Sequence, residues 1–423
     1  MARLRQLIRS PLAIICVFLL SRAAVALVPF GHTGYPKGHL VINDVTLYSA
    51  WATGLVEGRF PATDPMWQYP PLAGPIFAVG SLLHDNPDVG FMLLAFAADA
   101  AIMVTLLMAA RRTGRTTGAW VWAVAAIAVG PVFLTRFDVI PTLFAVLGLL
   151  ILARPATSGA LLGIGAAVKV WPVLILAAVP RRDLPKALLG FLVAVVVTTT
   201  AVWAWAGDDS LAFLDGQAER GLQMESVAAL PFLVGHLFGS DPGITYRYGS
   251  MEVGRSGTGT AAVIVSVVGL IALLTLAVAR LTGRLERIPG PDVAFAAVCV
   301  SIVASRVFSP QYMIWLLGIG AVCLVWRRTA MGWPVVLMLA AAAAAQILYP
   351  YGYSALISGG VAATLLQVAR IVMVVVATVL AFWAVLRGRG YPVATSGSTP
   401  SSKSVNRADM RSQPQDDSIH ARP

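Results

Sequence analysis

Candidate catalytic residues begin where the chain leaves its first long apolar stretch. Asp44 is followed by Leu47, Tyr48 and Trp51. In a helix over residues 44–57 these side chains share one face, because positions three, four and seven apart lie on the same side. A carboxylate beside aromatic rings at the headgroup level of a membrane suits a ligand that is part lipid and part sugar. The alternative is that Asp44 only caps the start of the helix.

The loop that follows adds a hydroxyl group. Residues 66–72 read Met-Trp-Gln-Tyr-Pro-Pro-Leu, so Tyr69 stands directly before two prolines. The prolines stiffen the entry into the next helix, and the Tyr69 hydroxyl could reach a ligand at the surface. Taken alone, a proline pair before an apolar run predicts only a helix start.

Three cations lie at or near apolar stretches: Arg136, Lys169 and Arg306. An unpaired cation in such a place is costly and is usually functional. The alternatives are structural. Lys169 could extend its amine to the membrane interface. Arg136 could form an ion pair with the nearby Asp138.

Two further candidates precede apolar runs. Gln311 and Tyr312 follow a Ser-Pro pair, where free backbone N–H groups and the Gln311 amide could bind phosphate or sugar. Ser309 could equally cap this helix at its proline-bearing first position. Glu225, in the polar segment 207–259, could be a second acid or a ligand of an acceptor sugar. Most other charged residues of that segment are expected to be solvated.

The elements that position these residues are predicted to be membrane helices. The chain has 423 residues, of which 58% are hydrophobic and only 12% charged, and its mean hydropathy is +0.78. A soluble domain carries roughly 25% charged residues. The apolar runs approach the roughly 20 residues that span a bilayer, and they do not alternate as the strands of a membrane β-barrel would. We therefore expect an all-α polytopic membrane protein.

Basic residues fall in short clusters between the apolar runs, which accounts for the net charge of +11 without a nucleic-acid partner. The clusters are Arg3/Arg5/Arg9, Arg111/Arg112/Arg115, Arg181/Arg182/Lys186, Arg280/Arg284/Arg287, Arg327/Arg328 and Arg387/Arg389. Cytoplasmic loops of membrane proteins are enriched in Lys and Arg. The N-terminus resembles a signal peptide, but the many later spans favour an uncleaved first span. We expect both termini on the cytoplasmic side of the cell membrane.

Residues 1–389 are predicted to form one membrane domain of about 11–13 helices with juxtamembrane helices on its outer face. Candidate spans cover about 11–29, 88–110, 118–134, 138–153, 157–180, 186–206, 260–281, 291–307, 311–326, 331–349 and 364–386. The loops at about 30–70 and 207–259, with shorter segments at 307–311 and 350–363, are then expected to face outward. Residues 390–423 are predicted to be a disordered cytoplasmic tail, because their composition cannot bury apolar surface.

One part of this topology leaves two interpretations open. In the first, residues 71–83 cross the membrane and 157–180 form a single helix, which places Arg111, Arg112 and Arg115 outside. In the second, 71–83 do not cross, and 157–180 break near Lys169 into two half-helices. The second obeys the charge rule better and places Arg136 on the outer side. We favour it, although half-helices are short for a bilayer of roughly 30 Å.

The ordered set of motifs resembles the GT-C glycosyltransferases, and more narrowly glycosyltransferase family 87. The residues that carry the resemblance are Asp44 with Tyr48 and Trp51, Gly58 with Pro61 and Asp64, Tyr69-Pro70-Pro71-Leu72, Arg136-Phe137-Asp138, Gly163 with Lys169-Val170-Trp171-Pro172, and Phe308-Ser309-Pro310-Gln311-Tyr312. They extend to about residue 330. The first loop departs from a metal-dependent pattern, because it holds no Asp-x-Asp motif.

This resemblance implies an α-mannosyltransferase that uses a polyprenyl-phosphate mannose donor and transfers to a glycolipid or glycan hydroxyl with inversion, outside the membrane. Asp44 would be the general base. Lys169, Arg136 and Arg306 would stabilise the departing phosphate. The residues expected to contact substrate are Tyr48, Trp51, Tyr69, Asp138, Glu225, Gln311 and Tyr312.

The alternative class is a transporter or flippase of lipid-linked sugars. The sequence shows no repeated halves and few charges within spans, which argues against it. An enzyme should gather its acidic and basic residues in one outward cavity, whereas a transporter should place them near the midplane. No metal-ligand spacing and no nucleotide-binding motif is present, so we expect neither a metal nor another cofactor.

Overall fold

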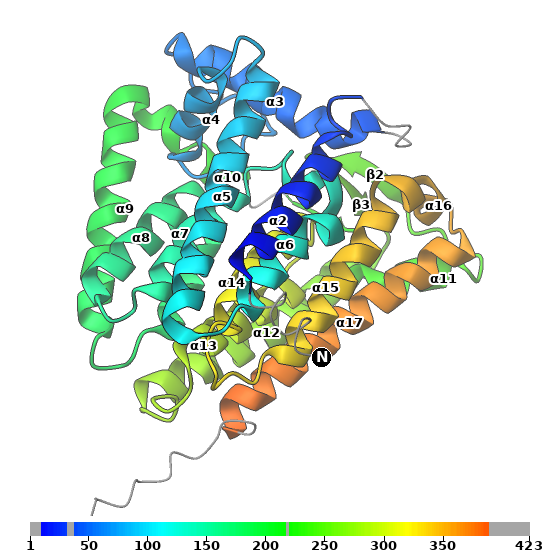
Figure 1. Ribbon diagram of the computed structural model, residues 1–423. Coiled ribbons are helices and arrows are strands. Elements are labelled where there is room, and N and C mark those ends of the chain that lie inside the picture. The colour runs from blue at the N-terminus through cyan, green and yellow to red at the C-terminus, as the bar shows by residue number, and fades with distance from the viewer. Residues whose placement is uncertain (1–9, 32–37, 217–219, 389–423) are drawn as a thin grey trace, which may run out of the picture. The chain divides into compact units, whose positions relative to one another are not determined.

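The computed structural model describes residues 10–31, 38–216 and 220–388 (Figure 1). The chain divides into two compact units, Met1–Tyr391 and Pro392–Pro423, and everything below concerns the first unit. The tail predicted for residues 390–423 lies outside the described residues, as do Arg3, Arg5 and Arg9.

The unit is mostly helical. Its α-helices are α2 (Pro11–Ala26), α3 (Gly38–Val56), α4 (Ala73–Ser81), α5 (Pro87–Thr113), α6 (Thr117–Val129), α7 (Val139–Leu150), α8 (Pro155–Val168), α9 (Leu184–Ala206), α10 (Phe213–Gly216), α11 (Leu230–His236), α12 (Thr258–Leu281), α13 (Gly290–Val303), α14 (Tyr312–Cys323), α15 (Gly332–Gln346), α16 (Tyr353–Ile357) and α17 (Val361–Arg387). Shorter helical turns are η1 (Gly130–Phe133), η2 (Trp171–Ala178), η3 (Gly207–Leu211), η4 (Val227–Ala229) and η5 (Ile347–Gly352).

Five helical segments are long and apolar enough to cross a membrane by length and composition: Pro87–Thr113, Leu184–Leu211, Thr258–Leu281, Gly332–Ile357 and Val361–Arg387. Shorter apolar helices accompany them, so the protein is a multi-span membrane protein. Each predicted span except 157–180 contains a helix close to the expected bounds. These bounds were predictable because continuous Ala, Leu and Val runs satisfy their backbone hydrogen bonds only as helices in lipid.

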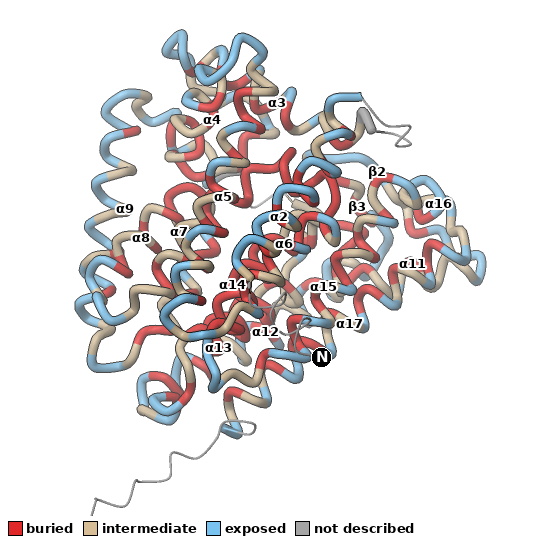
Figure 2. Tube along the Cα trace, viewed as in Figure 1, coloured by how far each residue is buried: buried red, intermediate tan, exposed pale blue. Residues whose placement is uncertain are grey.

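The helices differ in how far they are buried within the protein (Figure 2). Nearly every residue of α13 and α14 is buried. In contrast, α9 and α12 expose most of their apolar side chains, with only 11% and 17% of their most apolar windows buried. Lipid is as apolar as these side chains, so we assign α9 and α12 to the lipid-facing surface.

A buried ion pair joins α2 to α5. The Nε and Nη2 atoms of Arg22 donate to the two carboxylate oxygens of Asp99 at 2.8 and 2.9 Å, and Arg22 also donates to the carbonyl oxygens of Trp122 and Ala123 in α6. Both ionic side chains are almost completely buried. An intramembrane charge of this kind is stable only when it is paired and hydrogen-bonded, so the pair ties three helices together.

The segment after α9 contains a small sheet that the sequence analysis did not predict. Strands β1 (Leu222–Gln223), β2 (Ile244–Arg247) and β3 (Ser250–Val253) are antiparallel in the order β1-β3-β2. Tyr248 and Gly249 form the two-residue turn between β2 and β3, with φ values of 48° and 76°. Positive φ at both positions is the geometry of a type I′ hairpin turn, which is unusual for a tyrosine.

The basic connections meet at one end of the helices. The Arg181 backbone N–H donates to Glu286, and Arg280 donates to the carbonyl oxygen of Ala177. At the same end of the bundle, α6 begins against the end of α14, because a Cβ atom at Gly118 would overlap the Ala321 carbonyl oxygen. The clusters at 111–115, 181–186, 280–287 and 327–328 therefore lie on the same side.

This arrangement agrees with the second topological interpretation. Helix α4 has only nine residues, which is too short to cross a bilayer, and the predicted span 157–180 breaks at Lys169. The second half is η2, a 3-10 helix rather than the expected α-helix. The break leaves Lys169 in extended backbone directly after the end of α8.

Candidate active site

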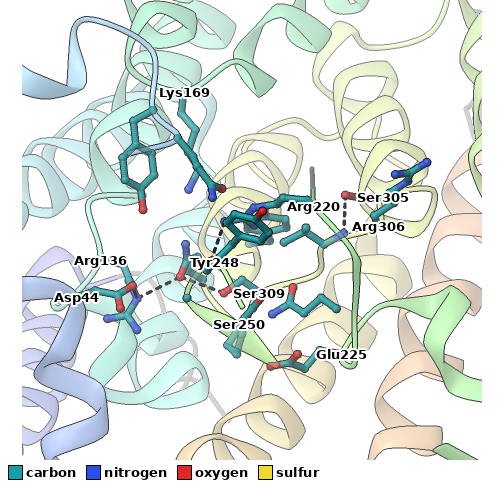
Figure 3. Close-up of a pocket in the computed structure, with 18 of the residues that line it drawn as sticks. Asp44, Arg136, Lys169, Arg220, Glu225, Tyr248, Ser250, Ser305, Arg306 and Ser309 are labelled. Atoms are coloured by element: carbon teal, nitrogen blue, oxygen red, sulfur yellow. Dashed lines mark hydrogen bonds and ion pairs between the residues drawn. The ribbon is translucent and has the colours of Figure 1, made fainter. Parts of the chain in front are cut away.

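A cavity of about 930 Å³ lies among the loops at the end of the unit away from the basic connections (Figure 3). Its walls come from all four segments predicted to face one side of the membrane, together with Arg136 and the Lys169 break. Eight of the predicted site residues line it: Asp44, Tyr69, Arg136, Lys169, Glu225, Arg306, Gln311 and Tyr312. Tyr48, Trp51 and Asp138 lie behind its walls.

Asp44 faces the cavity from the middle of α3, so the alternative that it caps a helix start is wrong. Its Oδ2 atom accepts from Arg136 Nε at 2.7 Å. The Asp44 side chain is 34% exposed, whereas that of Arg136 is 5% exposed. The pair thus presents an accessible carboxylate held by a buried guanidinium.

Further contacts fix the Arg136 guanidinium in place. Its Nη1 atom donates to the carbonyl oxygens of Val41 and Thr135, and its Nε atom also approaches Gln311 Oε1 at 3.1 Å. Burial lowers the pKa of the Arg136 guanidinium, but Asp44 and nearby tyrosines outweigh it and hold the pKa above its usual value. Arg136 therefore stays charged and orients Asp44.

Lys169 sits in a ring of aromatic side chains. Its Nζ atom lies 4.7 to 6.0 Å from the ring centroids of Tyr69, Phe137, Tyr312 and Trp315. It donates to Asp138 Oδ1 at 2.7 Å, and Trp315 Nε1 donates to the same oxygen at 2.6 Å. Asp138 is fully buried. The predicted alternative of a structural ion pair thus applies to Asp138, with Lys169 and not Arg136 as its partner.

Tyr48 and Trp51 pack into an aromatic cluster behind Asp44. Tyr48 stacks on Phe77 at 4.6 Å between centroids, and Trp51 meets Trp67 edge to face at 5.2 Å. The Trp51 Nε1–H donates to Asp64 at 2.7 Å. Both side chains follow Asp44 on one helix face, as the spacing indicates, but that face turns into the protein core. Neither reaches the cavity, so each supports the wall and does not form it.

Tyr69 continues this cluster out to the cavity surface. Its ring meets Phe137 edge to face at 4.8 Å. Burial raises the pKa of the Tyr69 phenol, and the Asp44 carboxylate raises it further, whereas the charge of Arg220 opposes the rise. The Tyr69 hydroxyl therefore stays protonated and can donate a hydrogen bond to a ligand.

Glu225 forms a separate polar group on the opposite wall. Its Oε1 atom accepts from the Tyr353 hydroxyl at 2.9 Å, and its backbone oxygen accepts from Gln367 and Arg370 of α17. Its Oε2 atom is buried without a partner among the described residues. Burial raises the pKa of the Glu225 carboxyl, and the charge of Arg370 opposes this. The Glu225 carboxyl therefore gives up its proton less readily than an ordinary glutamate side chain.

The helix start at Gln311 differs from the prediction. Gln311 is the N-cap residue of α14, and the Ser309 side chain makes no capping bond to this helix, although the Ser309 carbonyl oxygen accepts from the Tyr312 N–H. The Ser309 hydroxyl donates instead to Gln311 Oε1 at 3.0 Å, the oxygen that also accepts from Arg136. Ser309 and Gln311 therefore extend the hydrogen-bond network of Asp44 and Arg136 along the cavity wall.

Residues 67–241 match the model of glycosyltransferase family 87. This part of the chain is a glycosyltransferase family 87 domain. The protein is accordingly an enzyme that uses a polyprenyl-phosphate sugar donor, and the transporter alternative is not supported. No curated protein and no solved structure matches the chain.

The family 87 match contains Arg136, Asp138, Lys169 and Glu225 but ends before Gln311 and begins after Asp44. The cavity joins these parts, because Arg136 lies inside the matched range and contacts both Asp44 and Gln311 outside it. The cavity therefore extends beyond the matched segment.

Several cavity residues were missed by the sequence analysis. Arg220, Tyr246 and Tyr248 line the cavity although their loop was expected to be solvated, and Tyr349 in η5 and Tyr353 at the start of α16 line it as well. The two tyrosines near α15 had one usable signal, since they fall in the segment 350–363 predicted to face outward or directly before it. Arg220 had none, because the short sheet that positions it has no pattern in the sequence.

Metal ligands are not grouped in the part of the chain that the structure describes: no three His, Cys, Asp or Glu side chains come close enough to hold an ion. The three cysteines are unpaired thiols. The cavity chemistry visible here is that of carboxylates, guanidinium and ammonium groups, and phenols.

Proposed function

We propose that this glycosyltransferase transfers a mannosyl residue from polyprenyl-phosphate mannose to a hydroxyl of a glycolipid or glycan acceptor at the outer face of the membrane, with inversion. The observation that carries the proposal is Asp44. Only Asp44 and Glu225 bring carboxylates to the cavity wall formed by described residues, and Asp44 is the one that is open to a ligand.

The proposed step is a single displacement. The acceptor hydroxyl oxygen attacks C1 of the donor sugar while the bond from C1 to the phosphate oxygen breaks. The hydroxyl proton passes to Asp44, and the bonding electrons leave with the polyprenyl phosphate. A carboxylate in this place is most effective as oxocarbenium character develops at C1. Arg136 is the group that orients Asp44 for this transfer.

The donor phosphate needs cations on the cavity wall, because negative charge grows on it as the bond breaks. Of the three cations expected from the sequence, Lys169 and Arg306 line the cavity away from the proposed base, whereas Arg136 is paired with Asp44. The polyprenyl chain needs apolar surface, and the same cavity is lined by Leu214 and Val170, whose side chains are 60% and 56% exposed. One cavity can thus hold the phosphate and the start of the lipid.

The outer-face assignment is supported by the charge distribution. The basic clusters gather at the end of the helices away from the cavity (Figure 1). Because basic loops favour the cytoplasmic side, the cavity would open outside the membrane. Mannose as the sugar and a glycolipid or glycan as the acceptor come from the family 87 resemblance.

The test is transfer of radiolabelled mannose from polyprenyl-phosphate mannose to a mannolipid acceptor by the purified protein in nanodiscs. General-base catalysis contributes typically about 10²- to 10⁴-fold, so Asp44→Asn should lower kcat by that order while thermal unfolding stays close to wild type. Asp241→Asn is the matched control, because Asp241 is an exposed carboxylate outside the cavity. Transfer that survives Asp44→Asn would reject Asp44 as the base and direct attention to Glu225.

A further inference from the structure

The cations of the cavity fall into two kinds. Arg136 and Lys169 each have a carboxylate oxygen at 2.7 Å, from Asp44 and Asp138 respectively. Arg220 and Arg306 also line the cavity, and among the side chains that the structure describes no carboxylate oxygen lies within 4.0 Å of the charged nitrogens of either. An anionic ligand gains most from a cation whose charge is not already balanced.

Arg220 is the unbalanced cation that is built into the wall. Its Nη2 atom donates to the carbonyl oxygen of Tyr248 at 3.2 Å, and its Nε atom is buried without a partner among the described residues. The accepting carbonyl belongs to the β2–β3 turn, where Tyr248 adopts positive φ. A strained turn thus fixes the guanidinium while leaving donors unused. Arg306 is exposed, so water screens its charge more.

The Arg220 side chain points toward the centre of the cavity (Figure 3). In Figure 3 Asp44 and Arg136 lie on one side and Arg220 enters from the other, with Lys169 above both. The charge of Arg220 also lowers the pKa of Tyr69, against a larger rise from burial, as expected for a guanidinium that faces the same space.

Inversion restricts which cation can hold the phosphate. In a single displacement the base and the leaving group stand on opposite sides of C1. Arg136 contacts Asp44 directly, so it lies on the side of the base. Arg220 stands across the cavity from Asp44, on the side where the leaving group would depart.

We propose that Arg220 binds the phosphate of the polyprenyl-phosphate donor and stabilises the polyprenyl phosphate as it leaves. This assignment rests on the proposed inverting transfer. The donor is a phosphodiester with one negative charge, and the departing monoester gains a second as the bond to C1 breaks. A guanidinium offers paired donors that match phosphate oxygens, and its attraction increases with this charge.

The experiment separates phosphate binding from chemistry. Binding of geranylgeranyl phosphate and of geranylgeraniol is measured on the full-length protein in nanodiscs for wild type, Arg220→Gln, Arg136→Gln and Arg247→Gln. Arg247 is the matched control, because it is an exposed arginine of the same hairpin that does not line the cavity. Binding of the alcohol reports whether each variant keeps its apolar site.

We expect Arg220→Gln to weaken geranylgeranyl phosphate binding by about 10- to 100-fold, from the loss of charged hydrogen bonds, with the alcohol unaffected. Arg220→Lys should recover part of the affinity, because the charge remains and the planar fork does not. Arg136→Gln should keep phosphate affinity within about twofold of wild type while its turnover falls, because it acts through Asp44.

Four results would overturn the assignment. Unchanged phosphate affinity in Arg220→Gln removes its basis, and an equal loss in Arg247→Gln shows a general charge effect. A loss confined to Arg136→Gln moves the phosphate to the Asp44 side and leaves the transferase proposal intact. A wild-type protein that binds the phosphate no better than the alcohol rejects the donor itself, and with it both proposals.

Discussion

The Lys169–Asp138 pair shows how one buried charge can organise a site wall. The carboxylate accepts from both Lys169 and Trp315, and the ammonium group lies among four aromatic rings. Rings favour a cation through their negative faces, and the carboxylate supplies the balancing charge. The pair therefore holds Lys169 against the rings of Tyr69 and Tyr312, two residues that line the cavity.

Removing the charge of Asp138 should destabilise the protein. Asp138→Asn leaves the Lys169 ammonium group largely buried without an anion, and breaking a buried pair in this way costs about 3–5 kcal/mol. The free energy of unfolding, measured by denaturant titration in detergent, should fall by that amount. The double variant Asp138→Asn/Lys169→Met should recover part of the loss, because no unpaired charge remains. A double variant that is less stable than Asp138→Asn would contradict this account.

At the residue scale, charged side chains in apolar surroundings were predictable and their partners were not. Asp44, Arg136 and Lys169 were singled out because a charge near a membrane span is costly and usually has a partner or a function. The Asp44–Arg136 contact joins residues that are far apart in the chain, and a single sequence contains no signal for it. Arg220 was not singled out, because it lies in a loop with many charged residues that were expected to be solvated.

Among the elements, α8 and α9 approach each other closely. Gly159 and Gly163 form a Gly-x-x-x-Gly pattern on α8, and Gly190 lies on the facing surface of α9. A Cβ atom at Gly159 would overlap the Ala187 carbonyl oxygen, and one at Gly190 would overlap that of Ala156. Small residues let helices approach in lipid, where the hydrophobic effect does not drive them together.

A methyl group at this contact should separate the helices. Gly159→Ala is expected to lower the free energy of unfolding by about 1–3 kcal/mol or more, because the facing backbone cannot move away like a side chain. Gly332→Ala is the control, since a Cβ atom there meets nothing within 4 Å. Thermal unfolding in one detergent compares the two. Equal melting temperatures would show that α8 and α9 are not held this closely.

Helices were predictable at this scale, whereas the sheet was not. Apolar runs long enough to span a membrane determine their own helical structure. The break at Lys169 was open to prediction because a Trp-Pro pair follows it. The strands β1 to β3 have two to four residues each, so their pairing depends on tertiary contacts and leaves no periodic pattern.

The whole molecule separates a basic end from a cavity end, with α5 reaching from one toward the other (Figure 1). Twenty-seven helical residues extend about 40 Å, enough to cross the hydrocarbon core. Which connections share one end of the bundle was predictable from the basic clusters between the apolar runs. The cavity that these loops share was not predictable from the sequence, because it depends on contacts between loops that are far apart in the chain.

Cysteine accessibility tests the orientation of these two ends. In a protein with Cys16, Cys299 and Cys323 replaced by serine, Arg247→Cys should react with a membrane-impermeant maleimide in intact cells. Arg328→Cys should react only after permeabilisation, because basic connections are retained inside. Both positions are exposed in the structure, so burial does not explain a difference. The reverse labelling pattern would place the cavity in the cytoplasm.

The contacts of Glu225 with the last two helical segments have a consequence for biosynthesis. Its carboxylate is held by Tyr353 and its carbonyl by α17, while Tyr349 binds the carbonyl oxygen of Leu40. A nascent chain that has already inserted Asp44, Lys169 and Arg220 still lacks these contacts. The wall of the cavity closes only when the ribosome has delivered the final helix, so an unfinished chain cannot present a complete site to its lipid donor.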